Sequence, residues 1–286
     1  MSHLRIFIDL TRLNKPIGFM LLFWPCSWGL TFAFSNNQNL DLYLLYLILF
    51  FFGSVLMRSA GCIFNDIVDK DFDKKIKRTR KRPLASGKIK IIQSLIYVFV
   101  LCLLAFLVLI QFNLLTIILG MSSMLLAFSY PFMKRITYWP QLFLGITFNW
   151  GILMAWSAMN NSITIEIIIL YFSAIFWTLG YDTIYGAQDM SEDEIIGLKS
   201  TSIKFKKNIK NFIFFCYLIS SLGIIYLLKD YISLNMITFF LILFISSLFY
   251  QIIKFNLKQP KSCLSAFKFN NFSGFLLYLT FLSIAL

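Results

Sequence analysis

The sequence predicts an all-α protein, a multi-pass bundle of about nine transmembrane helices forming one integral-membrane domain over residues 1–286. Three observations predict this class. Hydrophobic residues make up 59% of the chain. Charged residues make up only 14%, whereas soluble domains carry about 25%. Mean hydropathy is +0.76, and the apolar residues lie in runs close to the roughly 20 residues that cross a bilayer as a helix. These values exclude a soluble globular protein and a disordered chain.

Nine apolar runs supply the spans, and each must be helical because the hydrocarbon core offers no partner for an unpaired backbone group. The first begins at Pro16, the second contains Arg58, and the sixth is apolar from residue 167 to 181 before it ends in charges. In chain order the predicted spans are residues 16–40, 42–65, 91–110, 112–133, 136–165, 163–187, 211–228, 232–253 and 269–286.

Lys and Arg gather on alternate loops, which predicts the orientation. The chain has 26 Lys and Arg against 13 Asp and Glu, a net charge of +13. Of the 26, 24 fall in the N-terminal stretch and in the loops after the second, fourth, sixth and eighth spans. Cytoplasmic loops carry this excess, so we expect the N-terminus inside, the C-terminus outside, and no nucleic acid as a partner. No long Arg- and Ser-rich presequence precedes the first span, which favours a bacterial inner membrane.

Nine of the 13 acidic residues lie in two clusters, at the cytoplasmic ends of the second and sixth spans. The first acidic motif is Asn65, Asp66, Asp69 and Asp73, and the second is Asp182, Tyr185, Asp189 and Asp193. Spacings of three and four place each set on one face of a continuing helix. Stacked carboxylates repel one another and require a compensating cation. Magnesium takes such oxygens and bridges them to substrate phosphates, so the two motifs predict Mg²⁺ around a diphosphate. The alternative is a set of solvated loop acids paired with nearby lysines.

Basic residues accompany both acidic motifs. Arg58 lies two turns before Asp66, inside a span, where an unpaired charge is costly and usually functional. An anionic substrate would explain why so many donors lie near the acids. The candidate substrate-binding residues on this argument are Arg58, Arg78, Arg82, Lys134, Arg135 and Lys199.

These residues resemble the motifs of the UbiA family of intramembrane aromatic prenyltransferases. The first motif reads NDxxDxxxD over residues 65–73, and the second reads YDxxYxxxDxxxD over residues 181–193, followed by GxKST at residues 197–201. Two segments with less specific motifs are similar to the 4-hydroxybenzoate branch of that family. They are residues 12–18 with Trp24-Pro25, and residues 130–135 with Pro140-Gln141.

The resemblance implies transfer of a polyprenyl group from a polyprenyl diphosphate to the ring carbon ortho to the hydroxyl of 4-hydroxybenzoate, in ubiquinone biosynthesis. It implies two Mg²⁺ ions bound by Asn65, Asp66, Asp69, Asp73, Asp189 and Asp193, and catalytic carboxylates at Asp66, Asp69, Asp73, Asp182, Asp189 and Asp193. Arg58, Arg78, Arg82 and Lys199 would share the diphosphate charge. Tyr130, Lys134 and Arg135 are candidates for the acceptor carboxylate, and the resemblance adds Asn65 and Tyr185 to the substrate-binding residues. The oligomeric state is not predicted.

Two alternatives remain. One is a sister prenyltransferase that acts on another acceptor, such as dihydroxynaphthoate or haem. The other is a cation-coupled transporter, which would more naturally carry its acids near the bilayer midplane. The cytoplasmic position of both acidic motifs favours the enzyme.

Overall fold

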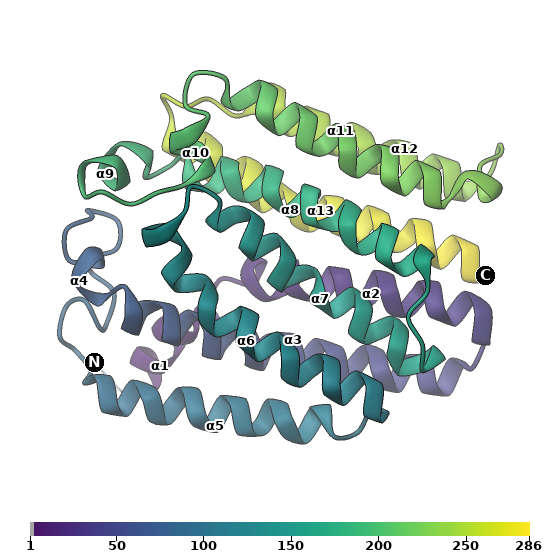
Figure 1. Cartoon of the computed structure of the whole chain (residues 1–286), viewed down its shortest axis with the longest axis horizontal. Helices are drawn as coiled ribbons and strands as arrows, with labels where there is room; N and C mark the ends of the chain where they lie inside the picture. The colour runs from purple at the N-terminus through teal and green to yellow at the C-terminus, as the bar shows by residue number, and fades with distance from the viewer. Residues whose placement is uncertain (1–2) are drawn as a thin grey trace.

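The nine predicted spans correspond to nine long helices in the computed structural model, which describes residues 3–286 (Figure 1). Among the described residues there is no β-strand. The long helices are α2 (Ile17–Asn37), α3 (Leu40–Val68), α5 (Ile91–Leu109), α6 (Leu114–Ile136), α7 (Pro140–Asn160), α8 (Ile165–Gly186), α11 (Ile209–Leu227), α12 (Met236–Lys254) and α13 (Pro260–Ala285). The all-α prediction is therefore confirmed.

Eight of these helices, within residues 3–286, are long and apolar enough to cross a membrane. The ninth, α13, has 26 residues but begins at Pro260, nine residues before the span that the sequence predicts. Proline suits this first helical position because its missing N–H would have no intrahelical partner there. Helix α13 thus includes a polar end with Lys261 and Lys268 before its apolar part begins.

Helices α2, α7 and α8 form the centre of the bundle. Their most apolar windows are 72%, 61% and 67% buried, whereas those of α5 and α6 are about one fifth buried. Glycines allow the central helices to approach closely. A Cβ atom on Gly29 would lie 2.6 Å from the carbonyl oxygen of Ile152, and one on Gly145 would lie 2.9 Å from that of Ile175. Small residues at such contacts are how membrane helices pack without a hydrophobic driving force.

A buried hydrogen-bond network ties α8, α11, α12 and α13 together. The side chains of Gln251 and Asn270 are paired amide to amide at 2.8 and 3.2 Å. Trp177 Nε1 donates to Asn270 Oδ1 at 2.9 Å, and the Tyr217 hydroxyl donates to Gln251 Oε1 at 2.9 Å. Such bonds between helices stabilise the bundle because hydrocarbon offers no other partner.

The short helices lie together at one end of the bundle, on the left of Figure 1. They are α1 (His3–Thr11), α4 (Lys70–Asp73), α9 (Met190–Ile195) and α10 (Thr201–Lys204), with a 3₁₀ turn, η1 (Lys229–Tyr231), elsewhere. Helices α3 and α8 end among them, and so bring both acidic motifs to the same end. The amphipathic helix α1 was not predicted; its signal is Ile6 and Leu10, four residues apart and both buried.

The orientation is testable with reporter fusions. We predict that alkaline phosphatase fused after Leu286 is active, because α13 as a ninth span places the C-terminus outside. The same enzyme inserted in the basic loop between α4 and α5 should be inactive, and a cytoplasmic reporter there should be active. The reverse pattern would contradict the orientation.

Candidate functional site

A cavity of about 1210 Å³ opens into the bundle at the end where the short helices gather. Its lining on α3 extends from Leu49 to Asp69, which corresponds to about 30 Å along a helix axis. One part of the lining is apolar: Phe50, Val108, Phe112, Trp150 and Met154. The other part is polar and includes residues of both acidic motifs. The cavity is therefore amphipathic along its length.

The first acidic motif lies at a break between two helices. Helix α3 ends at Val68, Asp69 has φ −93° and ψ 3°, and α4 begins at Lys70. The prediction of one continuous helix through Asp73 was wrong at this point. The turn nevertheless keeps all three carboxylates inside, with Asp66 and Asp69 each 1% and Asp73 4% exposed. Such burial rules out solvated loop acids for this motif.

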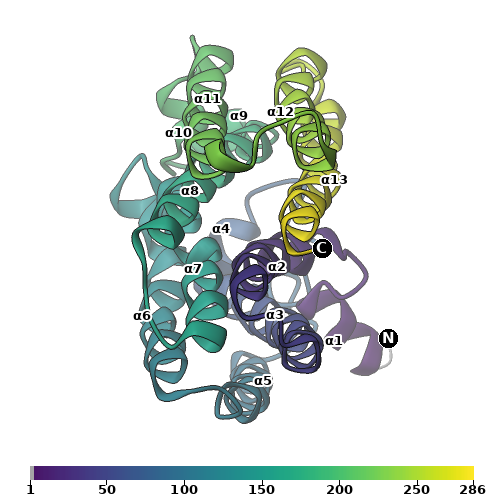
Figure 2. The same ribbon diagram turned by 90° about the vertical axis from the view of Figure 1, so that its right-hand side faces the viewer.

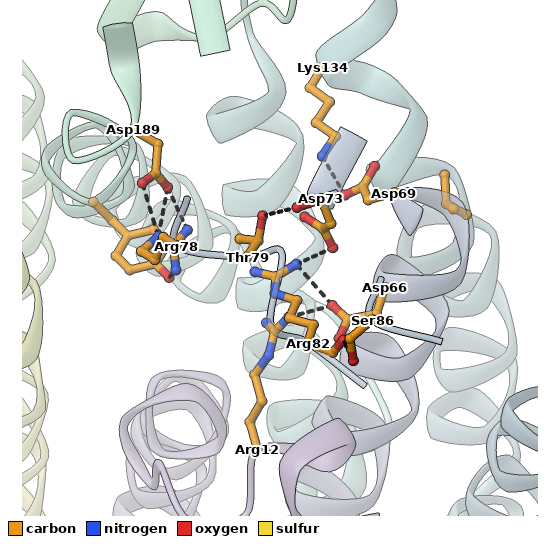
Figure 3. Close-up of polar contacts among 12 residues, drawn as sticks. Arg12, Asp66, Asp69, Asp73, Arg78, Thr79, Arg82, Ser86, Lys134 and Asp189 are labelled. Atoms are coloured by element: carbon orange, nitrogen blue, oxygen red, sulfur yellow. Dashed lines mark hydrogen bonds and ion pairs between the residues drawn. The ribbon is translucent and has the colours of Figure 1, made fainter. Parts of the chain in front are cut away.

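Basic side chains from distant segments neutralise these carboxylates (Figure 3). Asp66 Oδ1 accepts from Arg12 Nη2 at 2.6 Å and from Arg82 Nη1 at 3.0 Å. Arg82 Nη1 also lies 2.7 Å from Asp73 Oδ2, so one guanidinium bridges two carboxylates. Lys134 donates to Asp69 Oδ2. Since a buried charge is costly unless it is paired, these contacts compensate the buried carboxylates of the motif.

The second acidic motif begins at the end of α8 and continues into α9. The Arg78 guanidinium forms a fork on Asp189, with distances from 2.5 to 3.0 Å, and lies 3.3 Å from the Tyr185 hydroxyl. The Lys77 N–H donates to Glu192 at 3.0 Å. The loop that follows the first motif therefore contacts the second, so the two acidic motifs face one polar space, as the sequence predicts.

Deeper in the cavity lies a group of residues with unsatisfied polar atoms. Arg58 Nε is buried without a hydrogen-bond partner, and the guanidinium stacks over the Phe148 ring at 5.4 Å. Tyr130 and Asp182 line the same cavity and lie within electrostatic reach of Arg58. The Tyr181 hydroxyl is buried and unpartnered as well. A polar ligand that bonds to these atoms would be stabilised, because an unpartnered buried donor costs free energy.

Two predicted substrate-binding residues instead contact the protein backbone. Arg135 Nη2 donates to the Val68 carbonyl at 2.6 Å, where α3 ends, and does not line the cavity. Lys199 lines the cavity, but its Nζ donates to the Ile136 carbonyl at 3.1 Å. The other candidates that line the cavity are Arg58, Asn65, Arg78, Arg82, Tyr130, Lys134 and Tyr185. Arg12, which contacts Asp66, was absent from the predicted set.

Both motifs carry the oxygen donors that a divalent cation prefers. Among residues 3–286, no three acidic, His or Cys side chains are gathered closely enough to bind a metal as they stand. Asp66 Oδ2 and Asp69 Oδ1, however, are buried without a hydrogen-bond partner. Burial, with the nearby Asp189 charge, raises the pKa of Asp193 to about 6, and burial also raises that of Asp73. Carboxylate oxygens without a hydrogen-bond partner, and carboxyls whose pKa is raised by burial, can take further positive charge, so the residues fit a divalent cation.

The fold and the cavity define a class: a multi-pass helical membrane protein whose cavity joins an acid- and base-lined end to an apolar one. The model of the UbiA prenyltransferase family matches residues 22–275. The chain belongs to this family.

Among its relatives is the 4-hydroxybenzoate octaprenyltransferase of Psychromonas ingrahamii, 40% identical over 95% of this chain and 93% of that protein. The mitochondrial 4-hydroxybenzoate polyprenyltransferase of Bos taurus is 41% identical over 96% of this chain and 74% of its own. The match to the Rattus norvegicus protein of the same name, 47% identical over 73% of this chain, spans only 56% of that protein.

Solved structures support the same fold. A UbiA homologue from Aeropyrum pernix K1 superposes with a TM-score of 0.76 at 22% identity, over 90% of this chain and 94% of that one. A homologue from Archaeoglobus fulgidus, bound to GPP and Mg²⁺, gives a TM-score of 0.68 at 15% identity, over 98% of this chain and 100% of its own.

The acidic motifs should be essential for prenyl transfer. We predict that Asp66→Ala or Asp189→Ala lowers kcat/KM by on the order of 100-fold or more, because each removes charge that would hold the cation beside the diphosphate. Asp71→Ala is the matched control, since that side chain is 85% exposed and pairs only with Lys74 in the described contacts. Rates should be measured in membranes with equal amounts of inserted protein. Normal rates in both motif variants would contradict the assignment.

Proposed function

We propose that this chain transfers a polyprenyl group from a polyprenyl diphosphate to the ring carbon ortho to the hydroxyl of 4-hydroxybenzoate, a step of ubiquinone biosynthesis. The observation that carries the proposal is the cavity, in which acidic and basic side chains face each other at one end and apolar side chains line the rest. The names of the relatives from Psychromonas ingrahamii and Bos taurus support the acceptor.

The donor would lie along the cavity. Its apolar chain would contact Phe50, Val108, Phe112 and Trp150, and its diphosphate would lie among Asp69, Asp73 and Asp189. A prenyl chain requires the first environment and a diphosphate the second, so the amphipathic cavity fits both parts of one molecule. The concentration of Lys and Arg in the loops at this end supports a site on the cytoplasmic side of the membrane.

The resident basic side chains would move from carboxylates to phosphate oxygens when the donor binds. Arg78, Arg82 and Lys134 already lie at the acidic motifs, and guanidinium forks bind phosphate well. Mg²⁺ would be held by Asn65, Asp66, Asp69, Asp73, Asp189 and Asp193, and would supply neutralisation of the charge that develops on the leaving diphosphate. We assign Lys199 to a positioning role, because its backbone N–H donates to the Lys134 carbonyl at 2.8 Å.

The reaction then needs an acceptor ring beside the allylic carbon. The carbon–oxygen bond breaks with both electrons leaving on the diphosphate, and the ring carbon ortho to the hydroxyl forms the new carbon–carbon bond. As aromaticity returns, the proton on that carbon passes to the leaving diphosphate. We assign Asp182 to receive the hydroxyl proton, because its carboxylate lines the cavity near Arg58 and Tyr130. Cleavage of the carbon–oxygen bond leaves an allylic cation on the prenyl group. Since the site is buried in the bundle, water would be kept from this allylic cation.

Arg58 is our candidate for the acceptor carboxylate. Its guanidinium lies in a span, stacks on Phe148 and has an unpartnered Nε, whereas Arg78 and Arg82 are already engaged at the acidic motifs. An aromatic acid beside this arginine would satisfy the free donor and place its ring in the cavity.

Membranes that contain the chain should form the prenylated acid when given Mg²⁺, a polyprenyl diphosphate and 4-hydroxybenzoate. EDTA should abolish the product, and excess Mg²⁺ should restore it. The acceptor is varied in parallel, and the product is identified by mass. Product from dihydroxynaphthoate but none from 4-hydroxybenzoate would instead assign the chain to a sister prenyltransferase.

Arg58 variants separate the acceptor site from the donor site. We predict that Arg58→Ala raises the KM for 4-hydroxybenzoate by on the order of tenfold or more, because a charged hydrogen bond of about 1.5–3 kcal/mol is lost. The KM for the polyprenyl diphosphate should change much less, and Arg58→Lys should recover part of the affinity. An effect confined to the donor KM would reassign Arg58 to the diphosphate.

A further inference from the structure

The N-terminal helix α1 lies against α3 at the mouth of the cavity. Ile6 and Leu10 are buried beside Ile63 and Leu84, and the rings of Phe7 and Tyr97 meet edge to face at 5.2 Å. This is a small apolar contact surface. The segment from α1 to the start of α2 also lines the cavity, through Asp9, Thr11, Arg12, Asn14, Lys15 and Pro16. Residues 9–16 therefore form one wall of the cavity, and the helix before them packs on α3.

Arg12 connects this wall to the first acidic motif. It follows the last residue of α1 and has φ +57°, the left-handed region that non-glycine residues rarely occupy. Strained backbone of this kind persists only where the surroundings hold it. Here the guanidinium holds it, since Arg12 Nη2 lies 2.6 Å from the buried Asp66 Oδ1, and Figure 3 shows the side chain reaching that carboxylate beside Arg82.

The charges of this contact balance without any ligand. Arg12, Arg82, Asp66 and Asp73 form a linked set of two positive and two negative side chains. A divalent cation on the free Asp66 Oδ2 would add positive charge beside Arg12 and weaken its ion pair. A diphosphate that follows would bring negatively charged oxygens to this cation and next to Arg12, and would attract Arg12 again.

We propose that residues 3–16 form a lid whose latch is the Arg12–Asp66 ion pair. A divalent cation at the first acidic motif loosens the lid, and the diphosphate of the donor closes it through Arg12. Arg12 is thus a positioning residue that couples the occupancy of the site to its entrance. This inference rests on the diphosphate site of the proposed function, but the latch itself exists in the free protein.

Hydrogen–deuterium exchange on the full-length protein in lipid nanodiscs tests the lid. In Arg12→Gln, amides of residues 9–16 should exchange on the order of tenfold faster than in the wild type, because a charge-assisted latch is lost. The bundle should remain folded, since Arg82 still compensates Asp66; unchanged exchange in α8 and α11 checks this. Arg80→Gln is the matched control, because this exposed arginine lies outside the cavity lining. Wild-type exchange of residues 9–16 in Arg12→Gln would overturn the proposal.

The same exchange experiment with ligands added is the second test of the lid. In the wild type, Mg²⁺ alone should speed exchange of residues 9–16, and Mg²⁺ with geranyl diphosphate should slow it below the ligand-free rate. In Arg12→Gln neither ligand should change it. Protection of residues 181–193 by the same ligands reports donor binding independently. Protection there without a response in residues 9–16 would overturn the lid while leaving the proposed function intact, whereas no protection there would count against the proposed function itself.

Discussion

The bundle depends on compensation of charge at one end of a membrane protein. Carboxylates that are almost fully buried, such as Asp66 and Asp69, are tolerated only because guanidinium and ammonium groups lie within hydrogen-bond distance. The partners come from elsewhere in the chain: Arg12 from the end of α1, Lys134 from α6, and Arg82 from the loop after α4. Removing one side of this set would leave the other as uncompensated charge at the edge of hydrocarbon. These ion pairs therefore help to fix the arrangement of the short helices at this end.

The same compensation would let the site stay intact in the free protein and bind the highly charged donor that we propose. Basic side chains that neutralise the acids in the free protein are those that a diphosphate would engage, and the acids they release are those that a divalent cation would engage. Ligand binding would therefore replace ion pairs between side chains by ion pairs between the same side chains and the ligands. The charged groups of the site are already desolvated in the folded protein. Ligand binding therefore costs little further desolvation free energy.

The sequence predicted the spans and the acidic motifs well because both signals are local. A run of about 20 apolar residues by itself predicts a membrane helix. Spacings of three and four predict one face for Asp66, Asp69 and Asp73, and the turn at Asp69 keeps all three buried although the helix ends there. The ion pairs were not predictable in this way. Arg12 and Asp66 are 54 positions apart, and their contact depends on where α1 packs. Arg135 and Lys199 look like ligands in the sequence, yet they donate to backbone carbonyls because α3 and α6 end beside them.

The two acidic motifs differ in what holds them. The end of α8 is fastened by neutral hydrogen bonds: the Thr183 and Thr201 hydroxyls lie 2.7 Å apart, Ser202 donates to the Thr183 carbonyl, and the Thr201 N–H donates to Gln141. Such bonds do not respond to an arriving ion. The first motif is instead held at Asp66, Asp69 and Asp73 by ion pairs, which a cation or a phosphate competes for directly. The end of α8 therefore provides the fixed side of the site, whereas the first motif, and Asp189 through its ion pair with Arg78, provide the side that adjusts to the ligand.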